Sequence, residues 1–540
     1  MLPMRTFRIP RLVITGSGSS VQVAQEIRKL KVKKGLIATD QILVKLGLLD
    51  GIKWSLQQNS VPFAVFDGIF SEPTTDFVES GLKAYHENGC DFLLAVGGGS
   101  VIDAAKAIAV MATNAGSIVD YQGTGKIPKE GRPLIAIPTT AGTGSEVTPF
   151  TIVTDTRRNV KMLIGSPFLM PEISVVDPSL TLSMPPNITA ATGIDALTHA
   201  IEAYVSRKAQ PLTDIFCLSA IRLISGNLRR AWAIGKDIEA RESTMLGALQ
   251  AGIAFANSSV ALVHGMARPI GAYFHVAHGA SNAALLSVVM DFSLSGSPSR
   301  YAQIAQAMGE DTTGLSELPA ARKGVAAVKR LIKDIRVPSL RELGVDREKL
   351  MKLAPQMAED AIASGSPGNN PREATKEEIV ELYDIMATTL ELAGVEARHT
   401  HFARSLMPQA RGGKGDPNRA AFCEGGYNLY EPQNFEPIMD LADKSEIYYP
   451  KRSLQNEHPE TITRATMIRT PDSKLVLRPD GQSEFYDLAQ DARELHNVYG
   501  ERPYASRQAA LERRMLDWYI RTADVAPKEH DPRGFPKPAR

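Results

Sequence analysis

The sequence is poor in cysteine. Only three are present in 540 residues, Cys90, Cys217 and Cys423, and none belongs to a paired motif. This excludes a disulfide-stabilised scaffold and suits a reducing compartment, so a cytoplasmic location is expected. An excess of charge of one sign is also lacking, because 61 Lys and Arg face 60 Asp and Glu. Without a basic excess the chain has no general attraction for nucleic acid.

Long hydrophobic runs are missing as well. The most apolar stretch, residues 92–112, is interrupted by Asp103 and Lys106 and contains three consecutive glycines, so it fails as a membrane span. The first residues show no basic segment followed by an apolar one, so no secretory signal is expected. A hydrophobic content of 43% is that of an ordinary globular protein. Neither a membrane nor nucleic acid is therefore expected as a partner.

The first third of the chain alternates short apolar runs with helical patterns. The runs predicted as buried strands are residues 11–15, 35–40, 62–67, 92–96 and 134–138. This alternation predicts an α/β fold with a parallel sheet.

Further along, the pattern changes twice. Residues 190–206, 212–234 and 238–255 repeat their apolar positions with the helical period, which predicts an all-helical region. Near Tyr383, short strand patterns become frequent, and a small antiparallel sheet with a closing helix over 505–522 is predicted. We therefore expect three domains: 1–187, 188–382 and an α+β extension, 383–540.

One cluster of polar residues points to a metal. Asp195 and His199 are four residues apart on a predicted helix, so they project from one face, and His264 and His278 follow. One carboxylate and three imidazoles suit Fe(II), Zn(II) or a similar ion. Any one of these histidines alone is as readily explained as a buried helix residue. The set favours a metal site.

Two glycine- and hydroxyl-rich turns point to a phosphate-bearing ligand. Gly98, Gly99 and Ser100 follow an apolar strand and open a helix, where backbone amides favour an anion. A second such turn follows residues 134–138. Its hydroxyl-bearing candidates include Thr139, Thr140, Thr143 and Thr148. Asp40 ends another strand and suits a ribose hydroxyl, or else a helix N-cap. The Gly16–Val21 segment lacks the third glycine of a dinucleotide fingerprint and is interpreted as a strand-to-helix turn.

Residues 1–382 resemble the iron-containing (group III) alcohol dehydrogenase family. The matching stretches include GGGSVIDAAKAIA, IPTTAGTGSEVT, TAATGIDALTHAIEAYVS and ALVHGMARPIGAYFHVAHGASNA. The resemblance implies a dehydroquinate-synthase-like fold, with a metal and a nicotinamide between an α/β and a helical domain. It implies Asp195, His199, His264 and His278 as ligands, commonly of Fe(II) and sometimes of Zn(II). It also implies a dinucleotide site, with NAD(H) favoured over NADP(H) by Asp40. The residues of that site would be Asp40, Gly98, Gly99, Ser100, Thr139, Thr140, Thr143, Thr148 and Lys161.

One residue departs from the family pattern. Many members carry a further histidine four residues after His264, thought to relay the alcohol proton, and this chain has Arg268 there. Arginine keeps its proton near neutral pH, so His275 or a water is the expected relay. Arg268 is equally well interpreted as an anchor for a substrate carboxylate or a cofactor phosphate.

Residues 383–540 resemble the C-terminal part of a sulfatase. The stretches that carry this resemblance include Phe422-Cys-Glu-Gly-Gly, Met467-Ile-Arg-Thr and Glu484-Phe-Tyr-Asp-Leu. The Cys/Ser-x-Pro-x-Arg motif of sulfatases begins at none of the three cysteines, so sulfate-ester hydrolysis is not expected.

The expected function is that of a metal-dependent NAD(H) oxidoreductase interconverting a small alcohol and its aldehyde or ketone. Family resemblance implies a homo-oligomer. Two alternatives stay open: a catalytically impaired fusion that acts in assembly, and a maleylacetate-reductase-like or glycerol-dehydrogenase-like activity.

Overall fold

The structure, a computed structural model, describes residues 4–382 except 159, 377 and 381, residues 421–425, and residues 465–523 except 471, 480 and 481. The chain divides into two units, residues 1–404 and 405–540. The domain boundary predicted near Tyr383 lies at the end of the first described range.

All five strands predicted in the first third are present, joined by one more, in a six-stranded parallel sheet of order β1-β9-β6-β4-β2-β3. The bounds are β1 Leu12–Thr15, β2 Gly35–Ala38, β3 Phe63–Phe66, β4 Phe92–Gly97, β6 Leu134–Pro138 and β9 Ile173–Val176. Every residue of β4 is buried, as expected for a central strand covered on both faces. Strand β9 was not predicted.

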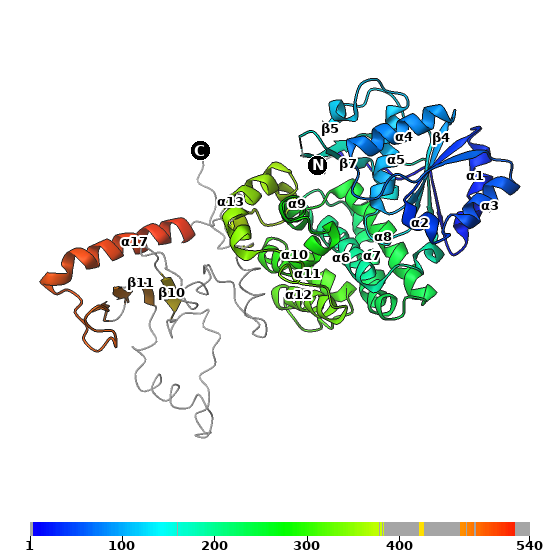
Figure 1. Ribbon diagram of the computed structural model, residues 1–540. Coiled ribbons are helices and arrows are strands. Elements are labelled where there is room, and N and C mark those ends of the chain that lie inside the picture. The colour runs from blue at the N-terminus through cyan, green and yellow to red at the C-terminus, as the bar shows by residue number, and fades with distance from the viewer. Residues whose placement is uncertain are drawn as a thin grey trace. The chain divides into compact units, whose positions relative to one another are not determined.

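Helices cover both faces of this sheet (Figure 1). They are α1 Val23–Lys29, α2 Gln41–Lys45, α3 Asp50–Gln58, α4 Thr75–Glu87 and α5 Gly99–Met111. Alternate residues of β4 point to opposite sides: Leu93 packs in one cluster with α4 and α5, and Leu94 in another with α1 and α3. A second sheet of order β5-β8-β7 adjoins α5, with bounds β5 Gly123–Thr124, β7 Phe150–Asp155 and β8 Val160–Gly165.

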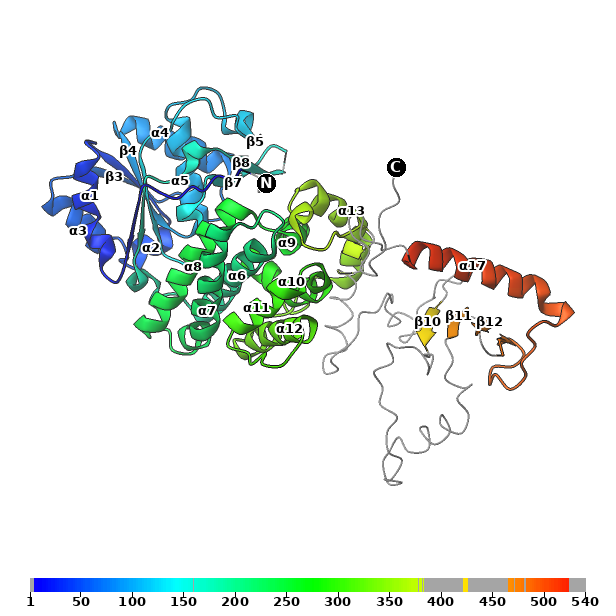
Figure 2. The same ribbon diagram turned by 180° about the vertical axis from the view of Figure 1, so that it is seen from behind.

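The region after β9 is helical, as predicted, and lies beside the sheet in both views (Figures 1 and 2). Its helices are α6 Pro186–Val205, α7 Pro211–Ala233, α8 Ile238–Ser258, α9 Leu262–Phe274, α10 His278–Ser293, α11 Pro298–Ala307, α12 Glu317–Asp334 and α13 Arg347–Ala363. Fifteen residues of α6 are buried, so it is the central helix of this core. Of the helices described, none alone is long and apolar enough to cross a membrane, although α8 and α9 pass that test together, bent by 102°.

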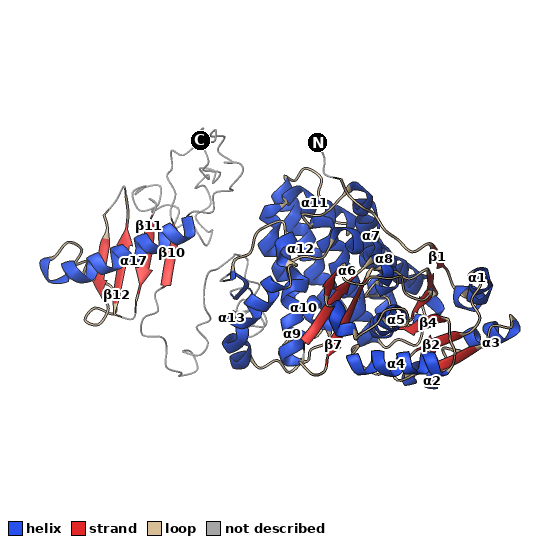
Figure 3. Ribbon diagram, turned by 90° about the horizontal axis from the view of Figure 1, so that it is seen from above, coloured by secondary structure: helices blue, strands red, loops and turns tan. Residues whose placement is uncertain are grey.

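The second unit contains the predicted antiparallel sheet and closing helix (Figure 3). Its elements are β10 Ala421–Gly425, β11 Ala465–Arg469, β12 Ser473–Leu477, β13 Glu484–Asp487 and α17 Ala505–Ala523. Ile468, Leu475 and Phe485 from the strands pack with Leu511 and Met515 of α17 in a small core.

Candidate active site

The candidate metal ligands come from three helices. Asp195 and His199 lie one turn apart on α6, His264 lies in the first turn of α9, and His278 is the first residue of α10. The backbones of α6 and α10 meet at Gly279, where a Cβ atom would lie only 2.6 Å from the carbonyl oxygen of Ala191. The glycine therefore allows the close approach that places His278 beside α6.

Three of the four predicted ligands form a buried cluster. One candidate ligand atom from each of Asp195, His199 and His264 lies within 4.8 Å of the others. His278 lies at the edge of this cluster: its Nε2 is 3.9 Å from Asp195 Oδ1, and its side chain is 40% exposed. The imidazole of His199 lies between two rings, 4.2 Å from that of Phe255 and 4.4 Å from that of His264.

Glu202 holds His264 in place. The Nδ1–H of His264 donates to Glu202 Oε2 at 2.6 Å, since an ionised carboxylate only accepts. The backbone amides of Ala261 and Val263 donate to the same carboxylate at 3.0 and 2.5 Å. Glu202 thus binds free amides at the start of α9 and leaves His264 Nε2 to face the cluster, as carboxylates behind metal-binding histidines do.

Asn282 lies among the candidate ligand atoms. Its Nδ2 donates to Asp195 Oδ1 at 2.6 Å and lies 3.1 Å from His264 Nε2 and 3.2 Å from His278 Nε2. One carboxylate oxygen and two imidazole nitrogens therefore converge on one point. Sequence reasoning missed both Glu202 and Asn282. The available signal was their helical spacing, since Glu202 follows Asp195 by seven residues and Asn282 follows His278 by four.

The ionisation of the cluster suits a cation. Burial opposes the charge of Asp195, but His199 and His278 outweigh it and hold the pKa of Asp195 below its usual range. Burial lowers the pKa of His199 to about 3, and partial loss of solvent around His278 lowers the pKa of that histidine to about 4, in both cases against the attraction of Asp195. Burial also disfavours the charged form of His264, yet the negative charge of Glu202 raises its pKa to about 9. Asp195 and the neutral imidazoles of His199 and His278 are ready donors at neutral pH, and His264 would release a proton when a cation binds.

These residues fit a divalent first-row metal ion. His199 Nδ1 is buried and has no hydrogen-bond partner within the described part of the chain. Burying a ring nitrogen without a partner costs folding free energy, and a metal ion at this site would provide an interaction partner for the cluster. One carboxylate with imidazoles is a donor set for Fe(II) or Zn(II).

The two turns predicted to bind a dinucleotide lie side by side. Strands β4 and β6 pair in parallel up to Gly97 and Pro138, so the turns after them share one edge of the sheet. Gly98 is the N-cap of α5, and a Cβ atom on Gly99 would lie 2.7 Å from the side chain of Thr143. This edge is where open α/β sheets bind ligands.

The other predicted dinucleotide residues have identified partners. Asp40 Oδ1 accepts from the amide of Leu43 at 2.9 Å, so Asp40 is the N-cap of α2. Thr148 is buried and its hydroxyl accepts from Lys106 Nζ at 2.9 Å. Lys161 lies on β8 and pairs with Glu72 at 2.5 Å.

A buried lysine, also missed from the sequence, supports the second turn. Lys106 is fully buried on α5 and its Nζ donates to Ser145 Oγ at 3.0 Å, to Thr148 Oγ1 at 2.9 Å and to the carbonyl oxygen of Phe150 at 2.7 Å. Burial lowers the pKa of Lys106 to about 8, against the opposing charge of Asp103. Lys106 therefore ties helix α5 to the chain that follows β6.

Arg268 and His275 both lie on or beside α9. Arg268 Nη1 donates to Ser366 Oγ at 3.1 Å. His275 ends the helix in the left-handed conformation, with a φ of 56°, and its side chain is exposed.

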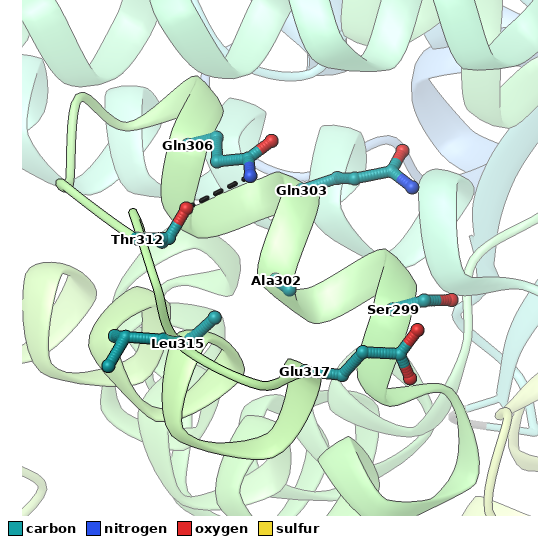
Figure 4. Close-up of a pocket in the computed structure, with 8 residues that line it drawn as sticks. Ser299, Ala302, Gln303, Gln306, Thr312, Leu315 and Glu317 are labelled. Carbon is teal, nitrogen blue, oxygen red and sulfur yellow. Dashed lines mark hydrogen bonds between the residues drawn. The ribbon is translucent and has the colours of Figure 1, made fainter.

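A hollow elsewhere in the helical region is separate from this site. Figure 4 shows it between α11 and the start of α12, where Gln306 Nε2 donates to Thr312 Oγ1 at 2.9 Å. Its volume is about 230 Å³, and it is lined by Ser299, Ala302, Gln303, Gln306, Thr312, Leu315, Glu317 and Ala320. None of these residues is a candidate ligand or dinucleotide contact.

The chain is similar to known proteins over every residue of this candidate site. A family model described as iron-containing alcohol dehydrogenase matches residues 10–178, and one for the C-terminal part of the Fe-containing alcohol dehydrogenase family matches residues 189–387. The 1,3-propanediol dehydrogenase of Klebsiella pneumoniae is 39% identical over 70% of this chain and 98% of its own length. The NAD-dependent methanol dehydrogenase of Bacillus methanolicus is 38% identical over 70% of this chain and 99% of its own length. A solved structure of 1,3-propanediol oxidoreductase superposes with a TM-score of 0.69 at 39% identity, covering 71% of this chain and all of that one.

Proposed function

The chain belongs to the iron-containing alcohol dehydrogenase family, and from this premise we propose that Asp195, His199, His264 and His278 bind its metal ion. It is an NAD-dependent oxidoreductase acting on CH–OH groups, which interconverts alcohols and aldehydes. We propose Fe(II) as the ion, with Zn(II) as the alternative. The buried cluster of Asp195, His199 and His264 carries this proposal, because it provides an anionic carboxylate and imidazoles at one point.

The ion would supply Lewis acidity, which polarises an aldehyde carbonyl or makes an alcohol hydroxyl more acidic. The protein's own residues would fix the directions of the ligands and keep water away from them. Glu202 holds the ring of His264 through Nδ1, and Phe255 stacks on His199, so both imidazoles are fixed in direction. The buried helices α6 and α9 exclude water around them.

We further propose that the adjacent turns bind NAD(H). The amides of Gly98, Gly99 and Ser100 suit the pyrophosphate, because they stand at the N-terminus of α5. The remaining contacts are proposed for Asp40, Thr139, Thr140, Thr143, Thr148 and Lys161. The NAD dependence named for the Bacillus methanolicus relative supports NAD(H) as the dinucleotide.

The preference for NAD(H) is testable at Asp40, whose carboxylate would accept from a ribose hydroxyl and repel a 2′-phosphate. Asparagine also caps helices, so Asp40→Asn keeps the start of α2 and removes only the charge. We expect this variant to use NADPH at least tenfold better relative to NADH. An unchanged ratio would contradict the role of Asp40.

The proton of the alcohol needs a path to solvent, because hydride transfer removes only the hydride from the C–H bond. We propose that His275, or a water, takes this proton, since Arg268 stays protonated. The exposed side chain of His275 supports exchange with solvent. If His275→Ala kept full activity across the pH range, the histidine relay would be wrong and water would remain.

The decisive experiment measures metal content after anaerobic purification, followed by NADH oxidation with short aldehydes and restored Fe(II) or Zn(II). We expect about one metal ion per chain and aldehyde-dependent turnover, both lost in His264→Ala. His86→Ala, which removes an exposed imidazole from α4, is the matched control and should keep both. NADH binding without metal or turnover in the wild type would instead favour an assembly role.

Several further features are proposed on sequence grounds. We propose the division into domains 1–187, 188–382 and 383–540, a cytoplasmic location and a homo-oligomeric state. The relation of residues 383–540 to sulfatases also stays a prediction.

A further inference from the structure

Arg268 lies beside the candidate metal cluster. It follows His264 by four residues on α9, so the two side chains leave the same face of the helix, about 6 Å apart along its axis. It is partly buried, and it interacts electrostatically with Glu202 and with His278.

Most N–H groups of the Arg268 guanidinium donate no hydrogen bond to the described residues. It offers five N–H donors, and its one hydrogen bond among the described residues is the 3.1 Å contact with Ser366 Oγ. No carboxylate within the described ranges lies at ion-pair distance from it. Burial lowers the pKa of Arg268, which Glu202 opposes, but an arginine keeps its charge near neutral pH. A partly buried guanidinium without a direct counter-ion, with donors still open, is suited to bind an anionic ligand.

The charged side chains of the site and a bound divalent ion together carry one positive charge more than negative charge. With a divalent ion bound, Asp195 and Glu202 balance it, and the imidazoles are neutral as ligands. Lys161, the other cation acting on His278, is already paired with Glu72. Arg268 is therefore the positive charge that the described site leaves unbalanced.

We propose that the substrate is a short aldehyde or alcohol bearing an anionic group. Arg268 would bind this anion while the reacting oxygen lies at the candidate metal site formed by Asp195, His199 and His264. The inference rests on the proposed function and names its substrate class. A carboxylate or a sulfonate shares the required chemistry, because both accept two parallel N–H bonds from a guanidinium. The axial separation of His264 and Arg268 suits a molecule of a few carbons.

The test compares aldehydes of matched length. Butanal and 4-oxobutanoate differ by a terminal carboxylate, and 2-oxoethanesulfonate presents a sulfonate. We expect wild-type enzyme loaded with metal to show kcat/KM at least tenfold higher for an anionic aldehyde than for butanal. A preference for 4-oxobutanoate would identify the anion as a carboxylate, and a preference for 2-oxoethanesulfonate as a sulfonate.

Substitution assigns the effect to Arg268. In Arg268→Gln the ratio of kcat/KM for anionic and neutral aldehydes should collapse towards one, mainly through KM. Arg268→Lys, which keeps the charge but not the planar fork, should give an intermediate ratio and serves if the glutamine variant fails to fold. Arg229→Gln removes an exposed arginine that pairs with Asp334, and should leave the ratio unchanged.

A binding measurement decides independently of turnover. Quenching of NADH fluorescence measures binding to the metal-loaded NADH complex. We expect 4-hydroxybutanoate and 2-hydroxyethanesulfonate to bind at least tenfold more tightly than 1-butanol. In Arg268→Gln this difference in affinity should disappear. Rapid turnover of butanal with no preference for either anion would overturn this inference and leave the proposed function standing. Absence of turnover with every aldehyde would count against the proposed function, and the binding ratio would still support or overturn the role of Arg268.

Discussion

Glu202→Gln tests whether the carboxylate behind His264 controls metal affinity. The side chain is 3% exposed and accepts three hydrogen bonds, from His264 Nδ1 and from the amides of Ala261 and Val263. Glutamine has nearly the same shape but carries no charge and replaces one accepting oxygen with a donor. The imidazole of His264 therefore loses either its charged partner or its orientation.

The expected effect follows from such carboxylate–histidine pairs, whose disruption weakens metal binding by about 10- to 100-fold, or roughly 1.4–2.7 kcal/mol. Competition with a chromophoric chelator measures this affinity without any turnover. Glu202→Asp, which keeps the charge one methylene short, should lose less. Glu239→Gln changes a glutamate whose side chain is 82% exposed on α8 and should bind metal as the wild type does. A folded Glu202→Gln protein with metal affinity within twofold of the wild type would refute the reasoning.

Three further predictions concern packing and buried charge. Gly279→Ala should lower the free energy of unfolding by about 1–3 kcal/mol and weaken metal binding, because its Cβ would meet the carbonyl of Ala191. Gly226→Ala on α7 has open space and should be neutral or slightly stabilising, as urea denaturation will show. Lys106→Met removes three hydrogen bonds of a buried ammonium group and should raise the Kd for NADH at least tenfold by fluorescence titration; an unchanged Kd would contradict its support of the turn. Burial raises the pKa of Glu146 to about 7 from 4.5, so the folded state holds this proton more tightly. Stability from this group is present below about pH 4.5 and is lost as the pH rises through 7; unfolding midpoints of Glu146→Gln should lack this decline.

The sequence predicted those parts of the fold that depend on local pattern. Residues 92–96 form a run of apolar side chains because β4 is covered on both faces, and such a run is visible without a structure. Strands β7 and β8 escaped prediction because polarity does not follow burial along them: Thr151 and Asp155 are buried, whereas Ile152 and Leu163 are exposed. Their pairing is set by a partner strand and by α5.

The residues of the site also fall into those that a local pattern reveals and those that depend on distant parts of the chain. Asp195 and His199 are recognisable because a helix presents residues four apart on one face. The helical spacing of Glu202 and Asn282 puts them on the faces that carry Asp195 and His278, but it does not show what they contact, since their role depends on His264, which is 62 and 18 residues away. Lys106 gave no signal because a lysine on an apolar helix looks like a solvent-facing residue until its three acceptors are placed around it.

The location of the proposed metal ligands on three helices, α6, α9 and α10, has a mechanical consequence. An ion held by Asp195 and His278 would close a loop of more than eighty residues, much as a covalent staple does, and would draw three helices together. Folding and metal loading would then be linked, and unloaded chains would open more often around α9 and α10. If the metal were scarce in the cell, proteases would cleave the unloaded chain more readily, so the abundance of the enzyme as well as its turnover would follow the supply of metal.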